Sequence, residues 1–324
     1  MPEVVLKNGV KFPCRPNETV LDAAEAHGVV LKHSCKTGRC GICMAKLIEG
    51  TTQSLGNEDF LSDNDDVLQN ILTCRRTALT DIKLNISDLS DFADIKKLIL
   101  PCRIKSIDLI THDTLHLRLK LPPNNQFKFL PGQYINLIAG EISRSYSIAN
   151  TPSSDGGLEL LVKRVDGGLM SDYLFDKAKE NDLLRIDGPH GTFCYRDDGE
   201  ENVLLLATGV GIAPIKALLE ESSSSIHRKN IFVVWGGRQV EELFLDIHAI
   251  HNGVHFLPVL SREKRNGYGH GYVQNEAMKQ RLNLKATSVY ACGSELMIKE
   301  ALALFKQNGL PTDRFYSDAF VSSN

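Results

Sequence analysis

Four cysteines in the first quarter of the chain have a spacing that suits a metal cluster. Cys35, Cys40 and Cys43 follow one another as Cys-x4-Cys-x2-Cys, and Cys74 stands alone after a further 30 residues. Four thiolates in this order are typical of a [2Fe–2S] site, which carries one electron at a time. The polar, glycine-containing loop can turn backbone N–H groups toward the sulfurs and stabilise their negative charge. The pattern therefore predicts one-electron chemistry.

Two alternatives to the cluster stay open. A structural zinc ion also takes four thiolates, although its ligands usually come as two short Cys-x2–4-Cys hooks rather than as three in one loop and one alone. Four unrelated reduced thiols are the simpler alternative. The other cysteines are scattered, and we interpret Cys14, Cys102 and Cys194 as buried apolar residues.

A second motif could hold an aromatic ring and a phosphate. In the strand-like sequence from Arg144 to Asn150, the side chains of Arg144 and Tyr146 project to the same face, because side chains alternate along a strand. That face offers a guanidinium to a phosphate and an aromatic plane to a ring system, which suits a flavin. A surface strand with one solvated arginine is the alternative interpretation.

A third motif could bind an anion. The sequence from Lys163 to Ser171 ends a strand, passes through Gly167 and Gly168, and opens a helix at Ser171. Free N–H groups and the positive end of a helix attract negative charge at such a turn. An ordinary turn with Ser171 as its N-cap residue is the alternative.

A glycine turn between an apolar strand and a helix is a fourth candidate. Gly209 and Gly211 let the backbone approach a pyrophosphate at the N-terminus of the helix that contains Pro214, although the spacing is not Gly-x-Gly-x-x-Gly. The sequences from Trp235 to Arg238 and from Tyr290 to Ser294 also stand at predicted strand ends, where ligands of parallel sheets collect. A plain strand-to-helix turn and a buried thiol are the alternatives. These sequences add Arg238, Cys292 and Gly293 to the candidate site residues.

The elements that must position these motifs follow three patterns. Residues 1–90 contain a strand-like stretch from Val4 to Phe12 and a helix-like stretch from Val20 to His27. Residues 98–198 contain many short strands and few helices, which predicts a small antiparallel β-barrel. Residues 200–324 alternate continuous apolar runs with helices, which predicts an α/β domain with a parallel sheet covered on both faces. We expect three domains with these boundaries and a linker over residues 88–98.

The composition is that of a globular protein with more than one core. The 324 residues include 42% hydrophobic and 24% charged side chains, with a formal net charge of −3. Without a basic excess, we expect no nucleic-acid partner. The sequence shows neither a signal-peptide pattern nor an apolar run of about eighteen residues, so we expect no membrane span. We expect a cytoplasmic protein, whose thiols stay reduced.

The first 90 residues resemble plant-type ferredoxins, which implies a β-grasp domain whose [2Fe–2S] cluster has the four cysteines as ligands. The Arg-x-Tyr-Ser motif, preceded by Pro131-Gly132-Gln133-Tyr134, resembles the flavin domain of the ferredoxin–NADP reductase superfamily. This second resemblance implies FAD in the barrel, with Arg144 at its pyrophosphate, Tyr146 against the isoalloxazine and Ser147 near the reactive N5.

The glycine turn and the two strand-end sequences match the nicotinamide domain of the same superfamily. The resemblance implies that Cys292 and Gly293 lie beside the nicotinamide, where hydride leaves, and that Cys292 and Ser147 are the catalytic residues. Phe320 matches a terminal aromatic residue that lies near the flavin, and a core aromatic is the alternative. Val210 departs from the threonine that is common in the family.

The choice between NADH and NADPH depends on a basic segment that follows a predicted strand. Ser261, Arg262 and Lys264 could bind the ribose phosphate of NADPH, and Ser-Arg-Glu followed by Tyr272 resembles the phosphate-binding segment of plant ferredoxin–NADP reductases. Glu263 could instead neutralise these cations, and a solvated loop is a further alternative. We expect NADPH to be accepted at least as readily as NADH.

The domain order over the whole chain resembles two groups of reductases. One group serves aromatic-ring dioxygenases and related monooxygenases. The other, the CDP-6-deoxy-delta-3,4-glucoseen reductases, serves a pyridoxamine-phosphate-dependent dehydrase in CDP-3,6-dideoxysugar synthesis, and the sequence from Ser317 to Val321 favours this group. The resemblance implies an enzyme that moves hydride from NAD(P)H to FAD and single electrons through the cluster to a partner protein. A non-enzymatic electron carrier is the alternative of another class.

Overall fold

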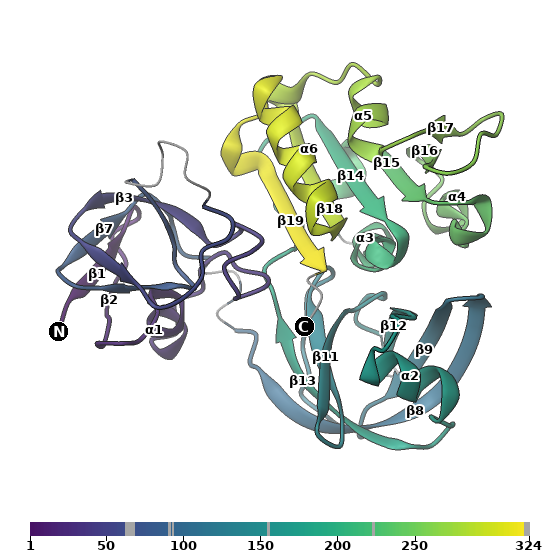
Figure 1. The fold of residues 1–324 in the computed structure, drawn as a ribbon, viewed down its shortest axis with the longest axis horizontal. Coiled ribbons are helices and arrows are strands. Elements are labelled where there is room, and N and C mark those ends of the chain that lie inside the picture. The colour runs from purple at the N-terminus through teal and green to yellow at the C-terminus, as the bar shows by residue number, and fades with distance from the viewer. Residues whose placement is uncertain (62–68, 90–91, 93, 154–155, 222–223, 321–324) are drawn as a thin grey trace. The chain divides into compact units, whose positions relative to one another are not determined.

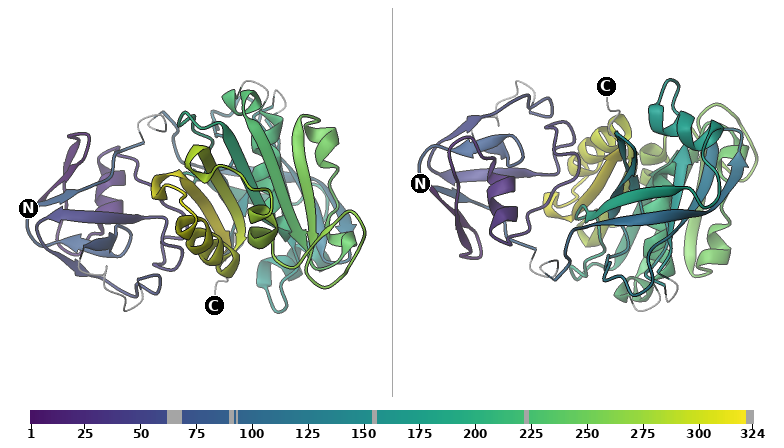
Figure 2. Two further views of the ribbon diagram at one scale, coloured as in Figure 1. Left: turned by 90° about the horizontal axis from the view of Figure 1, so that it is seen from above. Right: turned by 90° about the horizontal axis from the view of Figure 1, so that it is seen from below.

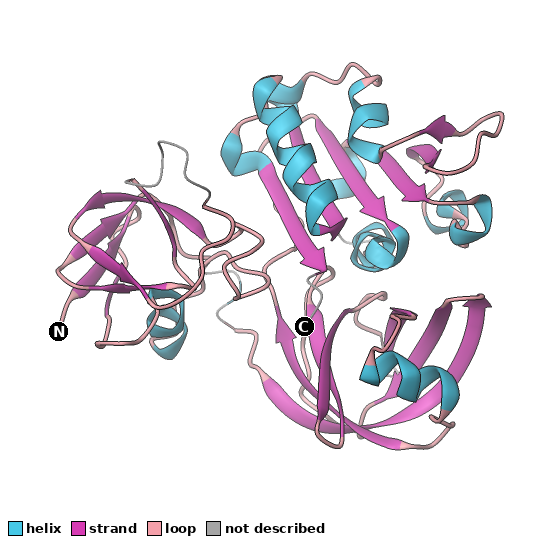
Figure 3. Cartoon of the chain, viewed as in Figure 1, coloured by secondary structure: helices cyan, strands magenta, loops and turns pink. Residues whose placement is uncertain are grey.

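The chain forms two compact units in the computed structural model, Met1–Ile95 and Lys96–Phe320. The structure describes residues 1–61, 69–89, 92, 94–153, 156–221 and 224–320, and its helices and strands are labelled in Figure 1 and coloured by class in Figure 3. Part of the linker expected over residues 88–98 lies outside the described residues, and strand β8 already begins at Leu98.

The described residues of the first unit form a mixed five-stranded sheet, in the order β2-β1-β7-β3-β5, a two-stranded sheet of β4 and β6, and one α-helix. The helix begins after Thr19, whose hydroxyl accepts a hydrogen bond from the Asp22 N–H (3.1 Å) and so caps the first turn. The single strand expected from Val4 to Phe12 is instead a hairpin, because Gly9 adopts φ +85° and turns the chain. The elements are β1 (Glu3–Leu6), β2 (Lys11–Pro13), α1 (Val20–Ala26), β3 (Met44–Glu49), β4 (Thr52–Ser54), β5 (Asn70–Leu72), β6 (Arg76–Ala78) and β7 (Ile82–Leu84).

An antiparallel barrel begins the second unit. Its six strands follow the order β11-β10-β13-β8-β9-β12, and a bridge between Ile148 and Leu160 joins the two edge strands. Apolar side chains from alternate positions fill its core, as the sequence pattern predicted. The elements are β8 (Leu98–Thr111), β9 (Thr114–Lys120), β10 (Tyr134–Ala139), β11 (Ile142–Ser147), β12 (Leu158–Lys163), α2 (Leu169–Asp176) and β13 (Leu183–His190).

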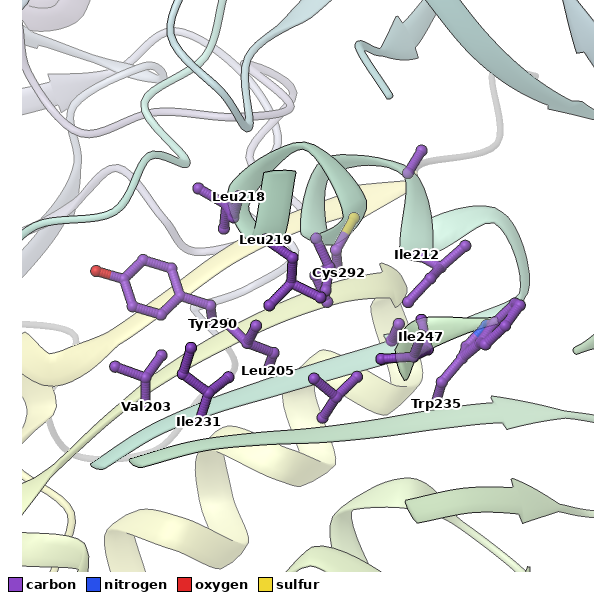
Figure 4. Packing of buried hydrophobic residues seen from close by; sticks show 14 of the residues in the cluster. Val203, Leu205, Ile212, Leu218, Leu219, Ile231, Trp235, Ile247, Tyr290 and Cys292 are labelled. Atoms are coloured by element: carbon purple, nitrogen blue, oxygen red, sulfur yellow. The ribbon is translucent and has the colours of Figure 1, made fainter. Parts of the chain in front are cut away.

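A six-stranded parallel sheet completes the second unit, in the order β17-β16-β15-β14-β18-β19 (Figure 2). Residues of α3 and α4, such as Leu218 and Ile247, pack on one face of the sheet with Leu205 and Tyr290 (Figure 4). Because helices cover the sheet, its strands are continuous apolar runs. The elements are β14 (Asn202–Thr208), η2 (Gly209–Gly211), α3 (Ile212–Glu220), η3 (Ser225–Arg228), β15 (Asn230–Gly237), η4 (Val240–Glu242), α4 (Ile247–Ile250), β16 (Val254–Leu260), β17 (Gly269–His270), α5 (Val273–Met278), η5 (Leu284–Ala286), β18 (Thr287–Ser294), α6 (Glu295–Gln307), η6 (Thr312–Arg314) and β19 (Phe315–Phe320).

The expected classes of fold are therefore present in the expected order. The domain boundaries at residues 90, 98, 198 and 200 remain predictions, since the barrel and the parallel sheet belong to one compact unit. None of the helices in the described part of the chain combines the length and the apolar character needed to span a membrane.

Candidate functional site

The four predicted cluster ligands come together in the first unit as two pairs. The Sγ atoms of Cys43 and Cys74 are 3.2 Å apart, and the thiol of Cys40 is hydrogen-bonded to that of Cys35. Among the described residues, no three or more His, Cys, Asp or Glu side chains are arranged around a single metal ion. Two pairs of sulfurs fit a cluster in which each of two irons takes two thiolates.

Backbone N–H groups of the cluster loop point at the sulfurs, as its glycine content predicted. The Thr37 N–H donates to the Sγ of Cys35 at 3.4 Å, and the Gly38 N–H donates to Cys74. Gly38 adopts φ +83°, and a Cβ at this position would lie 2.3 Å from the carbonyl oxygen of Asn57. Only glycine therefore allows this backbone path.

The two thiols of each pair shift each other's pKa in opposite directions. The hydrogen bond from Cys40 lowers the pKa of Cys35 to about 4 and, together with burial, raises the pKa of Cys40. The hydrogen bond from Cys43 likewise lowers the pKa of Cys74 and raises that of Cys43. A cluster would bind all four side chains as thiolates, so its binding depends on pH.

The predicted flavin-binding side chains share one stretch of β11. Arg144 and Tyr146 alternate along the strand, opposite Leu137 and Ile135 of β10. The Arg144 guanidinium is half-buried and donates only to a neighbouring carbonyl, that of Ser143 (2.7 Å), among the bonds of the described residues. Tyr146 packs against the barrel core, and burial raises the pKa of its hydroxyl. This face has the cation and the aromatic plane that a flavin dinucleotide needs.

The turn that was predicted to bind an anion differs from the prediction in two respects. The helix α2 begins at Leu169 rather than at Ser171, and Gly168 is its N-cap residue. The Ser171 hydroxyl lies inside the first turn and donates to the carbonyls of Val165 and Gly168 (3.1 and 2.9 Å), so it holds the turn together. Gly167 adopts φ +69° and has no atom within 4 Å of its Cβ position, so the backbone there stays open to a ligand.

The Lys163 ammonium group is paired with carboxylates and does not offer an unpaired charge to an anion at that turn. Its Nζ lies 3.2 Å from Oδ2 of Asp113 and 3.6 Å from Oε2 of Glu242. Arg238, at the end of β15, is held by the same two carboxylates, with Nη2 3.0 Å from Asp113 and Nε 2.5 Å from Glu242. Both predicted binding residues therefore belong to an ion cluster that sequence spacing did not indicate.

Asp318 is a site residue to which the sequence analysis assigned no role. It is only 6% exposed in β19, and its Oδ2 accepts a hydrogen bond from the Ser147 hydroxyl (3.4 Å). The register of β18 and β19 places it beside Cys292. Burial, and secondarily the charge of Asp318, raises the pKa of the Cys292 thiol, which is therefore neutral. The two predicted catalytic residues thus both have Asp318 as a neighbour, Ser147 through a hydrogen bond and Cys292 through the strand register. The acidic residue in the terminal strand was the signal for it.

The nucleotide turn is built by close backbone contacts. A Cβ on Gly211 would lie 2.3 Å from the carbonyl oxygen of Cys292, and one on Gly293 would lie 2.1 Å from Oγ1 of Thr208. Gly209 instead adopts φ +53° with open space at its Cβ position, and its carbonyl accepts from the Trp235 indole (2.9 Å). Pro214 is buried in the first turn of α3. The turn therefore leaves one glycine backbone accessible to a pyrophosphate at the start of a helix.

The proposed nucleotide-specificity residues lie at the ends of neighbouring strands. The N–H groups of Ser261 and Arg262 donate to the carbonyls of Gly237 and Arg238, both at 3.0 Å. The side chains of Ser261 and Arg262 are exposed, while the Glu263 carboxylate accepts the N–H of Val240 (3.1 Å). Phe320, which ends β19, is 37% exposed.

Comparisons with known proteins cover the whole chain. Three family models match in order: a 2Fe-2S iron-sulfur cluster binding domain over residues 4–79, an oxidoreductase FAD-binding domain over 101–195 and an oxidoreductase NAD-binding domain over 205–302. A cytochrome P450 reductase from Amycolatopsis has a similar structure, with a TM-score of 0.75, 27% identity and full coverage of both chains.

Curated relatives are similar over nearly their full length. Protein RfbI of Salmonella typhimurium is 37% identical over 99% of this chain and 96% of its own length. The CDP-6-deoxy-L-threo-D-glycero-4-hexulose-3-dehydrase reductase of Yersinia pestis is 38% identical over 98% of this chain and 97% of its own length. The reductase component 1 of the terephthalate 1,2-dioxygenase of Comamonas is 30% identical over 97% and 95%.

These matches confirm the predicted cofactors, a [2Fe–2S] cluster, FAD and NAD(P)H, in place of zinc or unrelated thiols. They also confirm an oxidoreductase rather than a simple electron carrier. The chain belongs to the ferredoxin–NADP reductase superfamily, among the NAD(P)H-dependent reductases that carry an iron–sulfur domain on the same polypeptide as the flavin and nicotinamide domains.

Proposed function

We propose that this reductase supplies electrons to a pyridoxamine-phosphate-dependent dehydrase that acts on a CDP-6-deoxyhexulose. One observation carries the proposal. The relatives from Yersinia that are named as reductases of such a dehydrase are 37–38% identical over 98% of the chain, against 30% for the terephthalate dioxygenase component. The reaction takes place in the cytoplasm on this proposal, since the cysteines are free thiols and such thiols persist in a reducing compartment.

The structure supports a division of labour among the proposed site residues. When bound, the flavin takes two electrons as hydride from NAD(P)H and releases them singly to the cluster. The Arg144 guanidinium would hold the flavin pyrophosphate, Tyr146 would support the ring, and the Gly209–Gly211 turn would receive the pyrophosphate of the nicotinamide dinucleotide. Hydride transfer needs correct placement rather than an acid or a base, so these residues act by positioning.

On this proposal, hydride moves beside the side chains of Ser147, Asp318 and Cys292. The Asp318 carboxylate fixes the Ser147 hydroxyl through the hydrogen bond between them. Cys292 is fully buried, and burial raises the pKa of its thiol. The thiol therefore packs against its surroundings as a neutral group and does not act as a nucleophile.

Reconstitution with the partner tests the proposal. The reductase, loaded with FAD and cluster, is mixed with NADH, the dehydrase with pyridoxamine phosphate, and the CDP-6-deoxyhexulose substrate, and 3-deoxygenated product is measured. We expect product only with the complete set, and no product with Cys40→Ser, which retains the flavin. Electron delivery to an oxygenase component but not to the dehydrase would place the chain in the oxygenase group instead.

A further inference from the structure

One strand of the barrel carries two opposite charges toward the parallel sheet. Glu159 and Lys163 lie four residues apart in β12, so their side chains leave the same face of the strand. Both side chains are half-buried. Glu159 pairs with Lys216 of α3, and Lys163 pairs with Glu242 of η4. Strand β12 therefore connects the barrel to the parallel-sheet part of the second unit at two points, one through its negative Glu159 and one through its positive Lys163.

The first point connects β12 to helix α3. The Nζ of Lys216 lies 3.2 Å from Oε2 of Glu159 and donates to the Ala149 carbonyl at 2.8 Å. His116 also bonds to Glu159 (3.2 Å). This hydrogen bond and the charge of Lys216 lower the pKa of Glu159 to about 2 in spite of burial. Because α3 follows directly on the Gly209–Gly211 turn, this contact positions the turn.

The second point connects β12 and the β8–β9 hairpin to the end of β15. It is the ion cluster of Lys163, Asp113, Arg238 and Glu242, in which the side chains of Asp113 and Glu242 are only 15% and 9% exposed. Burial raises the pKa of Asp113, but the charge of Lys163 together with hydrogen bonds from Lys163, Thr111 and Thr114 holds the pKa below the usual value. Strand β15 is the neighbour of β14 in the sheet. The two points therefore contact the helix that follows the nucleotide turn and the end of the strand beside β14.

We propose that these two ion clusters set the position of the nucleotide turn over the flavin face, which makes Glu159, Lys216 and Asp113 positioning residues for hydride transfer. A sliding of the sheet along β12 would separate Glu159 from Lys216 and Asp113 from Arg238, which removes attractive contacts between partly buried charges. Hydride transfer depends steeply on the distance between donor and acceptor, so a small displacement is sufficient to slow it. The inference rests on the proposed flavin and nucleotide sites but not on the proposed partner.

Single-turnover reduction of the bound flavin by NADH tests this inference without any dehydrase. We expect Glu159→Gln, Lys216→Gln and Asp113→Asn each to lower the limiting rate at saturating NADH by about 10- to 100-fold, with less than about threefold change in the Kd for NADH. The double variant of Glu159 and Lys216 is expected to lose no more than the worse single variant, because the two residues act as one unit.

Asp108→Asn is the matched control, because it breaks a comparable pair with Arg118 (2.9 Å) that lies within the barrel and is exposed. We expect this variant to keep the limiting rate. Flavin content and the midpoint of thermal unfolding are recorded for every variant. The inference is overturned by folded, flavin-loaded variants that keep the parent limiting rate, by losses that multiply in the double variant, or by an equal loss in Asp108→Asn. If one variant does not fold, the other two decide: Glu159→Gln and Lys216→Gln interrupt the first cluster, and Asp113→Asn interrupts the second.

Discussion

Replacement of Arg144 by alanine should weaken flavin binding without weakening the fold. The half-buried guanidinium donates a hydrogen bond to the Ser143 carbonyl, and a water molecule can donate to that carbonyl instead. We therefore expect the free energy of unfolding to change by less than about 0.5 kcal/mol. A charge-assisted bond to the flavin pyrophosphate is typically worth about 1.5–3 kcal/mol. The Kd for FAD should therefore rise by about 10- to 150-fold.

Titration of the apoprotein with FAD, followed by quenching of flavin fluorescence, measures this Kd directly. Arg118→Ala is the control, since Arg118 lies in the same barrel but pairs with Asp108 on an exposed surface. We expect its Kd to equal that of the parent protein. An unchanged Kd in a folded Arg144→Ala variant would refute the assignment and favour the alternative, a surface strand with one solvated arginine.

Three further changes probe the iron–sulfur cluster, the nucleotide site and the ion cluster of Glu159. Cys40→Ser should abolish binding of iron and acid-labile sulfide while NAD(P)H still reduces the flavin, because the two sites lie in different domains. Arg262→Ala should lower kcat/KM for NADPH by about tenfold more than for NADH, since the lost guanidinium would face the ribose phosphate. Glu159→Gln should reduce the free energy of unfolding by about 1–2 kcal/mol above pH 4.5, after allowance for screening. This difference should disappear as the pH falls toward 2, because the folded carboxyl has a pKa of about 2 against a usual 4.5.

The first two of these predictions have a control in the chain. Cys14→Ser changes a thiol that already bonds to the carbonyls of Arg15 and Glu18, so the cluster should survive it. Arg265→Ala removes a guanidinium that lies over the Tyr268 ring, and it should affect both nucleotides alike. Retained sulfide in Cys40→Ser, equal losses for both nucleotides, or a stability difference that does not depend on pH would each contradict the corresponding assignment.

The cluster site could be predicted from the sequence because three of its four ligands are local. Cys35, Cys40 and Cys43 lie within nine residues, and the glycines between them dictate the turns that aim N–H groups at sulfur. The barrel and the parallel sheet were likewise readable, since alternating strands and continuous apolar strands are direct consequences of how each sheet is covered.

The long-range charge partners could not be predicted in this way. Ser147 and Asp318 are 171 residues apart in the chain, and they meet only because β19 runs parallel to β18 beside Cys292. Lys163 was assigned to an anion because the strand that it ends leads through Gly167 and Gly168 to a helix, whereas Asp113 reaches it from a different hairpin. Spacing identifies which residues share a loop, but topology decides which charges neutralise one another.

The glycines of the nucleotide turn also show what the sequence alone could not predict, here for single residues. Gly209 and Gly211 belong to one short motif, yet the structure gives them different reasons to be glycine. Gly209 has a left-handed φ and open space around it, so its lack of a side chain leaves backbone accessible to a ligand. Gly211 lies against the Cys292 carbonyl, so its lack of a side chain lets η2 pack on the end of β18. A sequence motif therefore combines a binding requirement with a packing requirement, and only the geometry around each Cβ position separates the two.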